Sequence, residues 1–520
     1  GDLMRSQDAS EQAERLVATG FLALGPKSLN QRNKNIFMMD MVDEQIDVAT
    51  RATLGLSVSC ARCHDHKFDP IPTEDYYAIA GIFRSTKTFY GTSGGNGNRQ
   101  AGALLPMGKN AKSLKAALDT HRQEVSNLGK QLKKAQKELN LLKKKKGDAN
   151  IASEMEKWRE EIREKNTRLK QLRENSPQAP EYAMGVQDLN SPQDVRVHLR
   201  GDVDTLGELV PRGYLTVLKV PEAGLPPTGQ SGRLQLAEWL THEENPLSSR
   251  VIVNRIWHHL FGQGIVRTVD NFGSSGEEPS HLEMLDYLAI RFREKGWSIK
   301  ETIKEIVLSR TYRLSSDENQ KNFGVDSENR LLWRANTRRL QAEAIRDAIL
   351  TASGQIDLEP VKGSIISKVG NGNIGRGVNI PKDSMNNATH RSVYLPIARN
   401  FLPEFLRTFD FAEPSMIVGR RQETTVPAQA LFLLNSPFVS DQAMAMAKSI
   451  LKKGVGSPPE RLITTAYERA LSRQPTNDEL SKAIDFHQNE IEQNKETSQE
   501  EALARFCHAL FASAEFRYLN

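Results

Sequence analysis

Mostly apolar residues recur at alternating steps of four and three positions from Leu114 to Leu142, and again from Met155 to Leu172, with His121 and Lys165 as the polar exceptions. This spacing is typical of helices that pack along one another in a coiled coil. The polar stretch KKKKGDANIAS lies between the two runs and is long enough for a turn only. We therefore expect residues 111–176 to form an antiparallel coiled-coil hairpin.

The rest of the sequence is also mainly helical in pattern. Helical phrases alternate with turns in residues 1–110, and amphipathic helical phrases dominate residues 229–520. Between them, residues 177–228 contain the alternating phrase DVRVHLRGD, which predicts a half-buried strand, and a stretch rich in Pro and Gly. The sequence thus predicts a mainly α fold in which a small N-terminal domain, the hairpin and a short β-rich segment precede a large helical domain.

Composition excludes several classes of protein. The 520 residues contain three cysteines, too few for a disulfide-rich scaffold. No apolar run approaches the ~20 residues of a membrane-spanning helix. The net charge of +5 is small for this length and does not indicate nucleic-acid binding. The N-terminal residues lack a targeting signal, and the polar helical phrase after Gly1 makes us expect a further portion upstream.

The phrase LGLSVSCARCHDHKFDP, residues 54–70, contains a CxxCH motif formed by Cys60, Cys63 and His64. Two thiols at this spacing can bond to the two vinyl groups of one haem, and the following histidine is then the proximal iron ligand. A mixed-ligand metal site and a structural or disulfide role remain alternatives. A zinc site would need a second ligand pair, and Cys507, the remaining cysteine, lies in an amphipathic phrase typical of a core.

The residues around this motif offer further ligands. Met38, Met39 and Met41 are candidates for the sixth iron position, although such residues usually belong to a core. His66 is a candidate ligand for a neighbouring haem, and Asp65 and Asp69 could orient His64 or, with His66, bind a hard cation. The phrase ending at Cys60 predicts a helix that runs into the motif, and TEDYYAIAGIFRST predicts a second helix with Thr73 as its N-cap.

Five polar residues of the second half lie in loop-like phrases rather than on apolar faces: His281, Arg391, Asp410, Arg420 and Arg421. Arginines near aromatic residues suit an anionic or sugar-like ligand, so we expect a polar ligand site where these loops face the cysteine motif. The alternative is that the arginines form salt bridges between helices. His281 follows Ser280, and the two residues could simply begin a helix capped by the serine.

Several long phrases resemble the planctomycete-type secreted cytochromes. They include DEQIDVATRATLGLSVSCARCHDHKFDPIPTEDYYAIAGIF, NPLSSRVIVNRIWHHLFGQGIVRTVDNFGSSGEEPSHLEMLDYLA and TTVPAQALFLLNSPFV. In that family a haem-type cysteine domain of unknown function precedes a larger helical domain of unknown function. The resemblance implies domains at 1–110, the C-terminal part of a cytochrome-like domain, and at 229–520, with the hairpin 111–176 and the β-rich segment 177–228 between them.

From these observations we expect an exported c-type cytochrome of the periplasm or cell surface, with one haem c bound covalently through Cys60 and Cys63. Its partner would be a redox protein or an upstream cytochrome module, and it could belong to a surface oxidoreductase acting on polymers or sugars, including anionic polysaccharides. Two alternatives stay open: a cell-surface scaffold with a structural CxxCH motif, and a metal-dependent hydrolase that uses Asp65, His66 and Asp69.

Overall fold

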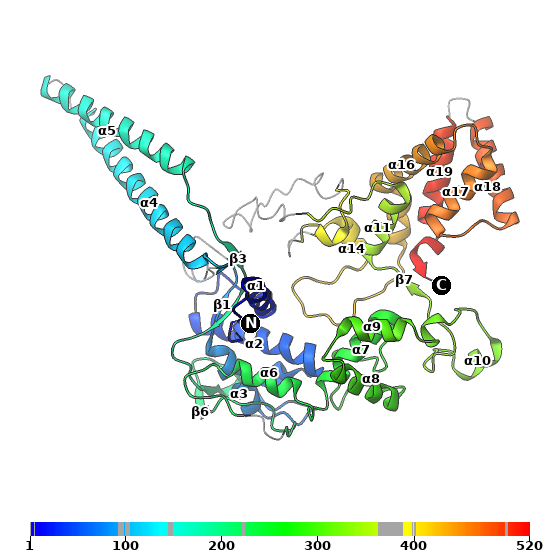
Figure 1. Cartoon of the computed structure of the whole chain (residues 1–520), viewed down its shortest axis with the longest axis horizontal. Coiled ribbons are helices and arrows are strands. Elements are labelled where there is room, and N and C mark those ends of the chain that lie inside the picture. The colour runs from blue at the N-terminus through cyan, green and yellow to red at the C-terminus, as the bar shows by residue number, and fades with distance from the viewer. Residues whose placement is uncertain are drawn as a thin grey trace. The chain divides into compact units, whose positions relative to one another are not determined.

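The protein is mainly α-helical, which confirms the predicted fold class (Figure 1). The computed structural model describes residues 2–4, 6–91, 98, 104–143, 149–220, 224–361, 388–397, 399, 402–493 and 498–519. Part of the polar stretch KKKKGDANIAS, residues 144–148, together with residues 362–387 and most of residues 92–103, lies outside these residues. In the described parts of the chain, no helix has both the length and the apolar character that crossing a bilayer requires.

The chain forms two compact units, and the first comprises residues 1–24 and 86–189. Its short strands pair antiparallel, β1 with β4 and β2 with β3. The elements of this unit are α1 (Ala9–Ala18), η1 (Thr19–Ala23), β1 (Thr86–Phe89), β2 (Leu105–Met107), α4 (Ala111–Leu142), α5 (Ala149–Glu174), β3 (Glu181–Ala183) and β4 (Gly185–Asp188).

Helices α4 and α5 are the two arms of the hairpin that the heptad pattern predicts (Figure 1). They run antiparallel, because Arg168 pairs with Glu124 at 3.3 Å while Lys165 donates to Gln131, also at 3.3 Å. Leucines and an alanine of the two stripes are buried between the helices, namely Leu118, Ala135, Leu139, Leu142, Leu169 and Leu172. Packing the two apolar stripes against each other removes them from water, and this holds the two otherwise polar helices together.

The second unit comprises residues 25–85 and 190–520. The segment 25–85 therefore groups with the large helical part of the chain, and the sequence boundaries predicted near residues 110, 176 and 228 stay predictions. The elements of its first part are α2 (Lys34–Leu54), η2 (Val58–Arg62), α3 (Thr73–Arg84), β5 (Val195–His198), η4 (Leu199–Gly201), β6 (Leu206–Val210), α6 (Arg233–Thr241), α7 (Ser248–Phe261), α8 (Leu282–Glu294) and α9 (Ile299–Val307).

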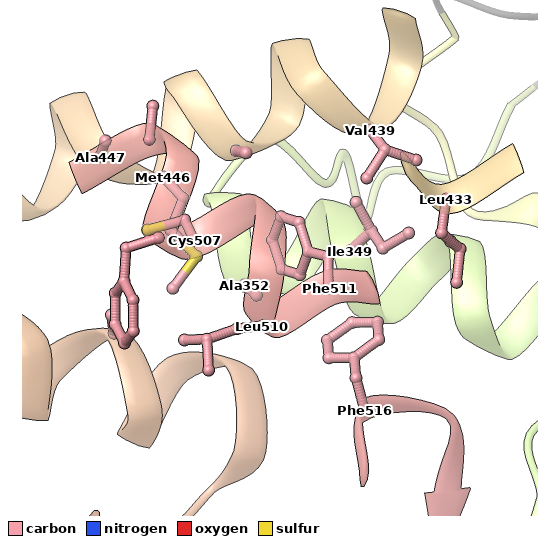
Figure 2. Close-up of a cluster of buried hydrophobic side chains, with 14 of the residues drawn as sticks. Ile349, Ala352, Leu433, Val439, Met446, Ala447, Cys507, Leu510, Phe511 and Phe516 are labelled. Carbon is pink, nitrogen blue, oxygen red and sulfur yellow. The ribbon is translucent and has the colours of Figure 1, made fainter. Parts of the chain in front are cut away.

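The remaining elements form a bundle with a large apolar core. Figure 2 shows Phe511, Cys507 and Met446 within this core, where the sequence predicts that Cys507 should lie. The bundle and the residues before it contain η5 (Thr311–Arg313), α10 (Gln320–Val325), β7 (Arg338–Arg339), α11 (Ala342–Ser353), η6 (Ser392–Tyr394), α14 (Glu404–Thr408), α15 (Pro427–Asn435), α16 (Pro437–Lys453), α17 (Pro459–Leu471), α18 (Asn477–Gln493), α19 (Gln499–Ala512), η7 (Glu515–Arg517) and β8 (Tyr518–Leu519), with β7 paired to β8.

Three helix boundaries differ from the predictions. Helix α2 does not run into the cysteine motif, because Gly55 adopts a left-handed conformation at φ 63° and ends the helix at Leu54. Thr73 is the first residue of α3 rather than its N-cap, a position that Pro72 takes. His281 is itself the N-cap of α8, so it is not within a first turn capped by Ser280.

Candidate functional site

The CxxCH motif lies on the short 3-10 helix η2 and the turn that follows it. Cys60 and Cys63 are exposed free thiols, whereas Val58 and Ala61 on the other side of η2 are buried in the core. The backbone N–H of Cys60 donates to the Ser57 carbonyl oxygen at 3.1 Å, which closes the first turn of η2. The core contacts therefore fix the helix and leave both thiols open to a reaction partner.

His64 is exposed, and its imidazole has a defined tautomer. The Nδ1 atom lies 2.6 Å from the carbonyl oxygen of Asp65. Because a carbonyl oxygen can only accept, Nδ1 must carry the hydrogen and donate it. In the neutral ring the lone pair is then on Nε2, which is the state that a metal-ligating histidine needs.

Two tyrosines of helix α3 support the backbone and the arginine of the motif. The Tyr77 hydroxyl lies 3.0 Å from the carbonyl oxygen of Arg62, and burial raises the pKa of Tyr77 to about 12. The neighbouring Tyr76 donates to a carboxylate oxygen of Asp43 at 2.9 Å. Arg62 lies between Asp43 and Asp40 of α2, so α2 and α3 together hold η2 in place.

The two residues after His64 are fully engaged within the protein. A carboxylate oxygen of Asp65 accepts from the backbone N–H of Thr73 at 2.9 Å, where its charge stabilises the N-terminus of α3. His66 accepts the backbone N–H of Asp69 at Nδ1, at 2.8 Å, and its Nε2 lies 3.1 Å from the Ser57 hydroxyl. Both nitrogens of His66 thus have partners, which disfavours the predicted role of His66 as an iron ligand.

Asp69 connects the motif to a distant loop of the same unit. Its buried carboxylate accepts from the backbone N–H of Ser274 at 2.7 Å and from the Ser274 hydroxyl at 2.9 Å. The carboxylate of Asp69 lies so close to Gly273 that a Cβ atom on this glycine would be 2.3 Å from it. Nearby, the backbone N–H of Phe272 donates to the carbonyl oxygen of Gly55 at 2.8 Å. The motif loop is therefore held on both sides of the cysteines by residues 272–274.

The tip of the β5–β6 hairpin lies against Cys63 of the motif. At its tip, Gly201 has φ 77°, and a Cβ atom there would lie 2.5 Å from the Sγ atom of Cys63. The same tip exposes Leu199 and Leu206 to solvent. Next to the tip, the ring of His198 packs edge-on against Tyr77. Burial and the nearby arginines lower the pKa of His198, so this imidazole is held neutral.

The three candidate methionines lie on helix α2. Met39 and Met41 are buried in the core, and Met38 is half-buried. Helix α2 contacts the motif through Asp40 and Asp43, which both pair with Arg62. Among the residues that the structure describes, no three His, Cys, Asp or Glu side chains are grouped so that they could hold a metal ion.

Two of the second-half candidates have structural partners. Arg421 forms a bidentate ion pair with Glu343 of α11, at 2.6 and 2.9 Å, and lies over the ring of Phe411. Asp410 has φ 61° and accepts from Arg339 and from Thr424. These contacts hold loops of the bundle together, as the salt-bridge alternative predicts.

The other three candidates have fewer contacts with charged partners. Arg391 contacts Tyr394, three residues away, and Arg420 is exposed near His258 of α7. Burial, followed by His259 and Arg420, lowers the pKa of His258 to about 4. His281 lines a cleft at the start of α8. Arg420 and Arg421 thus lie near His258 and His259, respectively, and the ligand site that would join them to Arg391 stays a prediction.

Family profiles match most of the chain outside the hairpin and the β-rich segment. Residues 1–88 match PSCyt2, a protein of unknown function (DUF1549), and residues 232–487 match PSD1, a protein of unknown function (DUF1553). The chain belongs to the family that carries this planctomycete cytochrome-type domain pair. No curated protein and no solved structure is significantly similar to the chain.

The two family matches show which parts of the chain the contacts of Asp69 connect. Asp69 belongs to the PSCyt2 match and Ser274 to the PSD1 match, so this hydrogen-bonded pair joins the two matched regions. Sequence reasoning missed Ser274 and Gly201, which contact the motif from segments far along the chain. The glycine-rich phrases FGSSG and HLRGD were the available signals, since glycines often mark a close approach of backbone.

Proposed function

We propose that Cys60 and Cys63 hold one haem c through thioether bonds, with His64 as the proximal iron ligand through Nε2. The observation that carries the proposal is the tautomer of His64. Its Nδ1–H is committed to the carbonyl oxygen of Asp65, next to two exposed thiols with haem-type spacing. A bound haem would supply a one-electron redox couple.

The surroundings of the motif fit such a group. Leu199 and Leu206 are exposed at the hairpin tip that reaches Cys63, and Phe68 is 59% exposed on the motif loop itself. Exposed apolar side chains close to one another are typical of binding surfaces, and a porphyrin is a large apolar plane. Cys60 and Cys63 lie at the surface, so a haem that they held would supply its redox chemistry where another protein can approach.

We therefore propose that the chain is an exported c-type cytochrome that exchanges single electrons with a redox protein or an upstream cytochrome module. A location in the periplasm or at the cell surface, and a role in a surface oxidoreductase acting on polymers or sugars, belong to the same proposal. The membership of the chain in a cytochrome-type family supports it. The burial of Met39 and Met41 and the hydrogen bonds of His66 do not support these residues as further iron ligands, so the sixth ligand, with Met38 among the candidates, stays a prediction.

The two alternatives have less support. In a metal-dependent hydrolase, Asp65, His66 and Asp69 would have to converge on one ion, but they bond instead to Thr73, Ser57 and Ser274. In a scaffold with a structural CxxCH motif, the cysteines would be buried or bridged, whereas Cys60 and Cys63 are exposed and free. Free exposed thiols add nothing to a core.

The test is an absorption spectrum of the chain produced with c-type haem maturation machinery. We expect the reduced spectrum of a c-type haem in the natural chain, its loss in Cys60→Ser and Cys63→Ser, and altered iron ligation in His64→Ala. Cys507→Ala is the matched control, because it removes the buried third thiol without touching the motif. A spectrum without haem, or one unchanged by Cys60→Ser and Cys63→Ser, contradicts the proposal.

A further inference from the structure

A cleft lies within the PSD1 region, on residues that the proposed haem site does not use. It is an open cleft with a cavity volume of about 20 Å³, and it lies where the turn after α7, the start of α8 and the loop before β7 meet. Its lining includes the apolar side chains of Trp257, Ile265 and Leu332. The cleft is thus a candidate binding site that is independent of the CxxCH motif.

Two buried asparagines hold the segments around the cleft in place. Asn254, which is fully buried, donates to the carbonyl oxygen of Val266 at 2.9 Å and accepts its N–H at 2.8 Å. On the opposite side Asn329 is also buried, and its Nδ2 donates to the Arg334 carbonyl oxygen and to Asn336 Oδ1, each at 2.8 Å. Each segment is therefore held by a buried amide, and the cleft does not depend on a ligand for its form.

Two residues of the lining loop have left-handed backbone conformations. Asn329 has φ 51° and Leu332 has φ 53°. Asparagine tolerates this conformation, but for leucine it is unfavourable and must be imposed by the surrounding contacts. Strained positions of this kind occur preferentially at ligand sites. Here Arg330 lies between the two strained residues.

The charges at the cleft favour an anion. Arg330 and Arg267 line it, and no aspartate or glutamate does. Arg267 pairs at 2.8 Å with Glu328, whose side chain is 64% exposed. Arg330 is exposed and forms no ion pair with any residue that the structure describes, so its guanidinium is open to a carboxylate, sulfate or phosphate group.

His281 adds a second polar group at the cleft. The hydroxyl of Ser280 lies 3.3 Å from the Ile265 carbonyl oxygen and 3.0 Å from Nδ1 of His281. The contact with Ser280 thus engages Nδ1 of the ring. Nε2 is the second polar atom of the imidazole, and in either tautomer it can form a hydrogen bond with a ligand hydroxyl, which both donates and accepts.

We propose that a small anionic polyol binds across the open mouth of this cleft, with its oxyanion at Arg330 and a hydroxyl group at His281. A sugar acid and a sugar phosphate share this chemistry. The neutral polar groups of Gln263 and Asn336, which also line the cleft, suit the remaining hydroxyls. The proposal concerns the PSD1 region alone and does not depend on whether the chain binds haem.

The test is calorimetric titration of the full chain at low salt with glucuronate, a hexose phosphate, inorganic phosphate and neutral glucose. We expect the two sugar anions to bind, and glucose to bind at least about tenfold more weakly because it lacks the charge-assisted contact. Arg330→Gln should weaken both sugar anions about tenfold, and His281→Asn should weaken the sugar anions but not inorganic phosphate.

Arg461→Gln is the matched control, because Arg461 is also an exposed arginine, lies on α17 and does not line the cleft. It should leave all affinities unchanged. The proposal is overturned if neither sugar anion binds, if Arg330→Gln and Arg461→Gln bind the sugar anions equally, or if glucose binds as tightly as glucuronate. Because Arg330 is exposed, its replacement should not affect folding, which a circular dichroism spectrum verifies.

Discussion

Replacing Asp69 by alanine should release the motif loop from residues 272–274. The change removes the acceptor of two hydrogen bonds from Ser274, at 2.7 and 2.9 Å, and leaves the backbone N–H of Ser274 without a partner. The Ser274 hydroxyl has one hydrogen for Asp69 and for the Phe68 carbonyl oxygen, at 2.8 Å, and can donate to that carbonyl alone after the change, so its loss is partial. With about 1.5–3 kcal/mol for a bond to a charged group, we expect a total loss of about 2–4 kcal/mol.

Amide hydrogen exchange is the appropriate assay, because it reports local opening rather than global unfolding of a large chain. A loss of about 2–4 kcal/mol corresponds to exchange about 30- to 1000-fold faster at Phe272 and Ser274. Asp69→Asn retains a neutral acceptor and should accelerate exchange only about fivefold. Asp485→Ala, which removes an exposed carboxylate on α18, is the control. If Asp69→Ala changes exchange at residues 272–276 no more than Asp485→Ala does, the reasoning is refuted.

Three further predictions concern other parts of the chain. Gly201→Ala should reduce the fraction of chains that carry haem, because its Cβ would lie 2.5 Å from Cys63 Sγ; Gly207→Ala in the same hairpin is the control, and equal haem content by absorbance would contradict this. His487 is buried, and neither ring nitrogen has a partner among the described residues. Burial lowers the pKa of His487 from 6.5. The stability that the neutral ring contributes is therefore present above about pH 6.5 and is lost as the pH falls below that value. His487→Leu should therefore make the urea midpoint less sensitive to acid than in the natural chain, and an unchanged sensitivity would show that His487 does not carry the effect. Replacing residues 112–175 by a short Gly/Ser linker should leave the rest folded with its prosthetic group, whereas global unfolding in circular dichroism would show that the hairpin is part of a core.

The elements that could be predicted from the sequence are those whose signal is local. The stripe through Leu118 and Leu139 predicts α4 because coiled-coil packing repeats along the chain itself. The end of α2 was predictable in principle, since Gly55 is a typical C-cap, but the apolar run toward Cys60 suggested a longer helix. Local patterns therefore predict which elements form better than they predict where each element ends.

The candidate site was only partly predictable, because its contacts join residues far apart along the chain. Nothing near Asp69 indicates Ser274, and nothing near Cys63 indicates Gly201, although each pair is in direct contact. The ion pair of Arg421 could not be predicted for a related reason, because its partner, Glu343, lies on a helix 78 positions away. Loop-like sequence around an arginine does not distinguish a ligand site from a salt bridge.

Denaturing mass spectrometry of the chain, produced with c-type haem maturation machinery, tests the central claim most directly. Thioether bonds survive denaturation, whereas a haem that is only coordinated dissociates. The account predicts that the intact chain retains the mass of one haem, and that the chain with Cys60→Ser and Cys63→Ser retains none. A properly matured chain with a bare dithiol, a disulfide or bound zinc at Cys60 and Cys63 would contradict it.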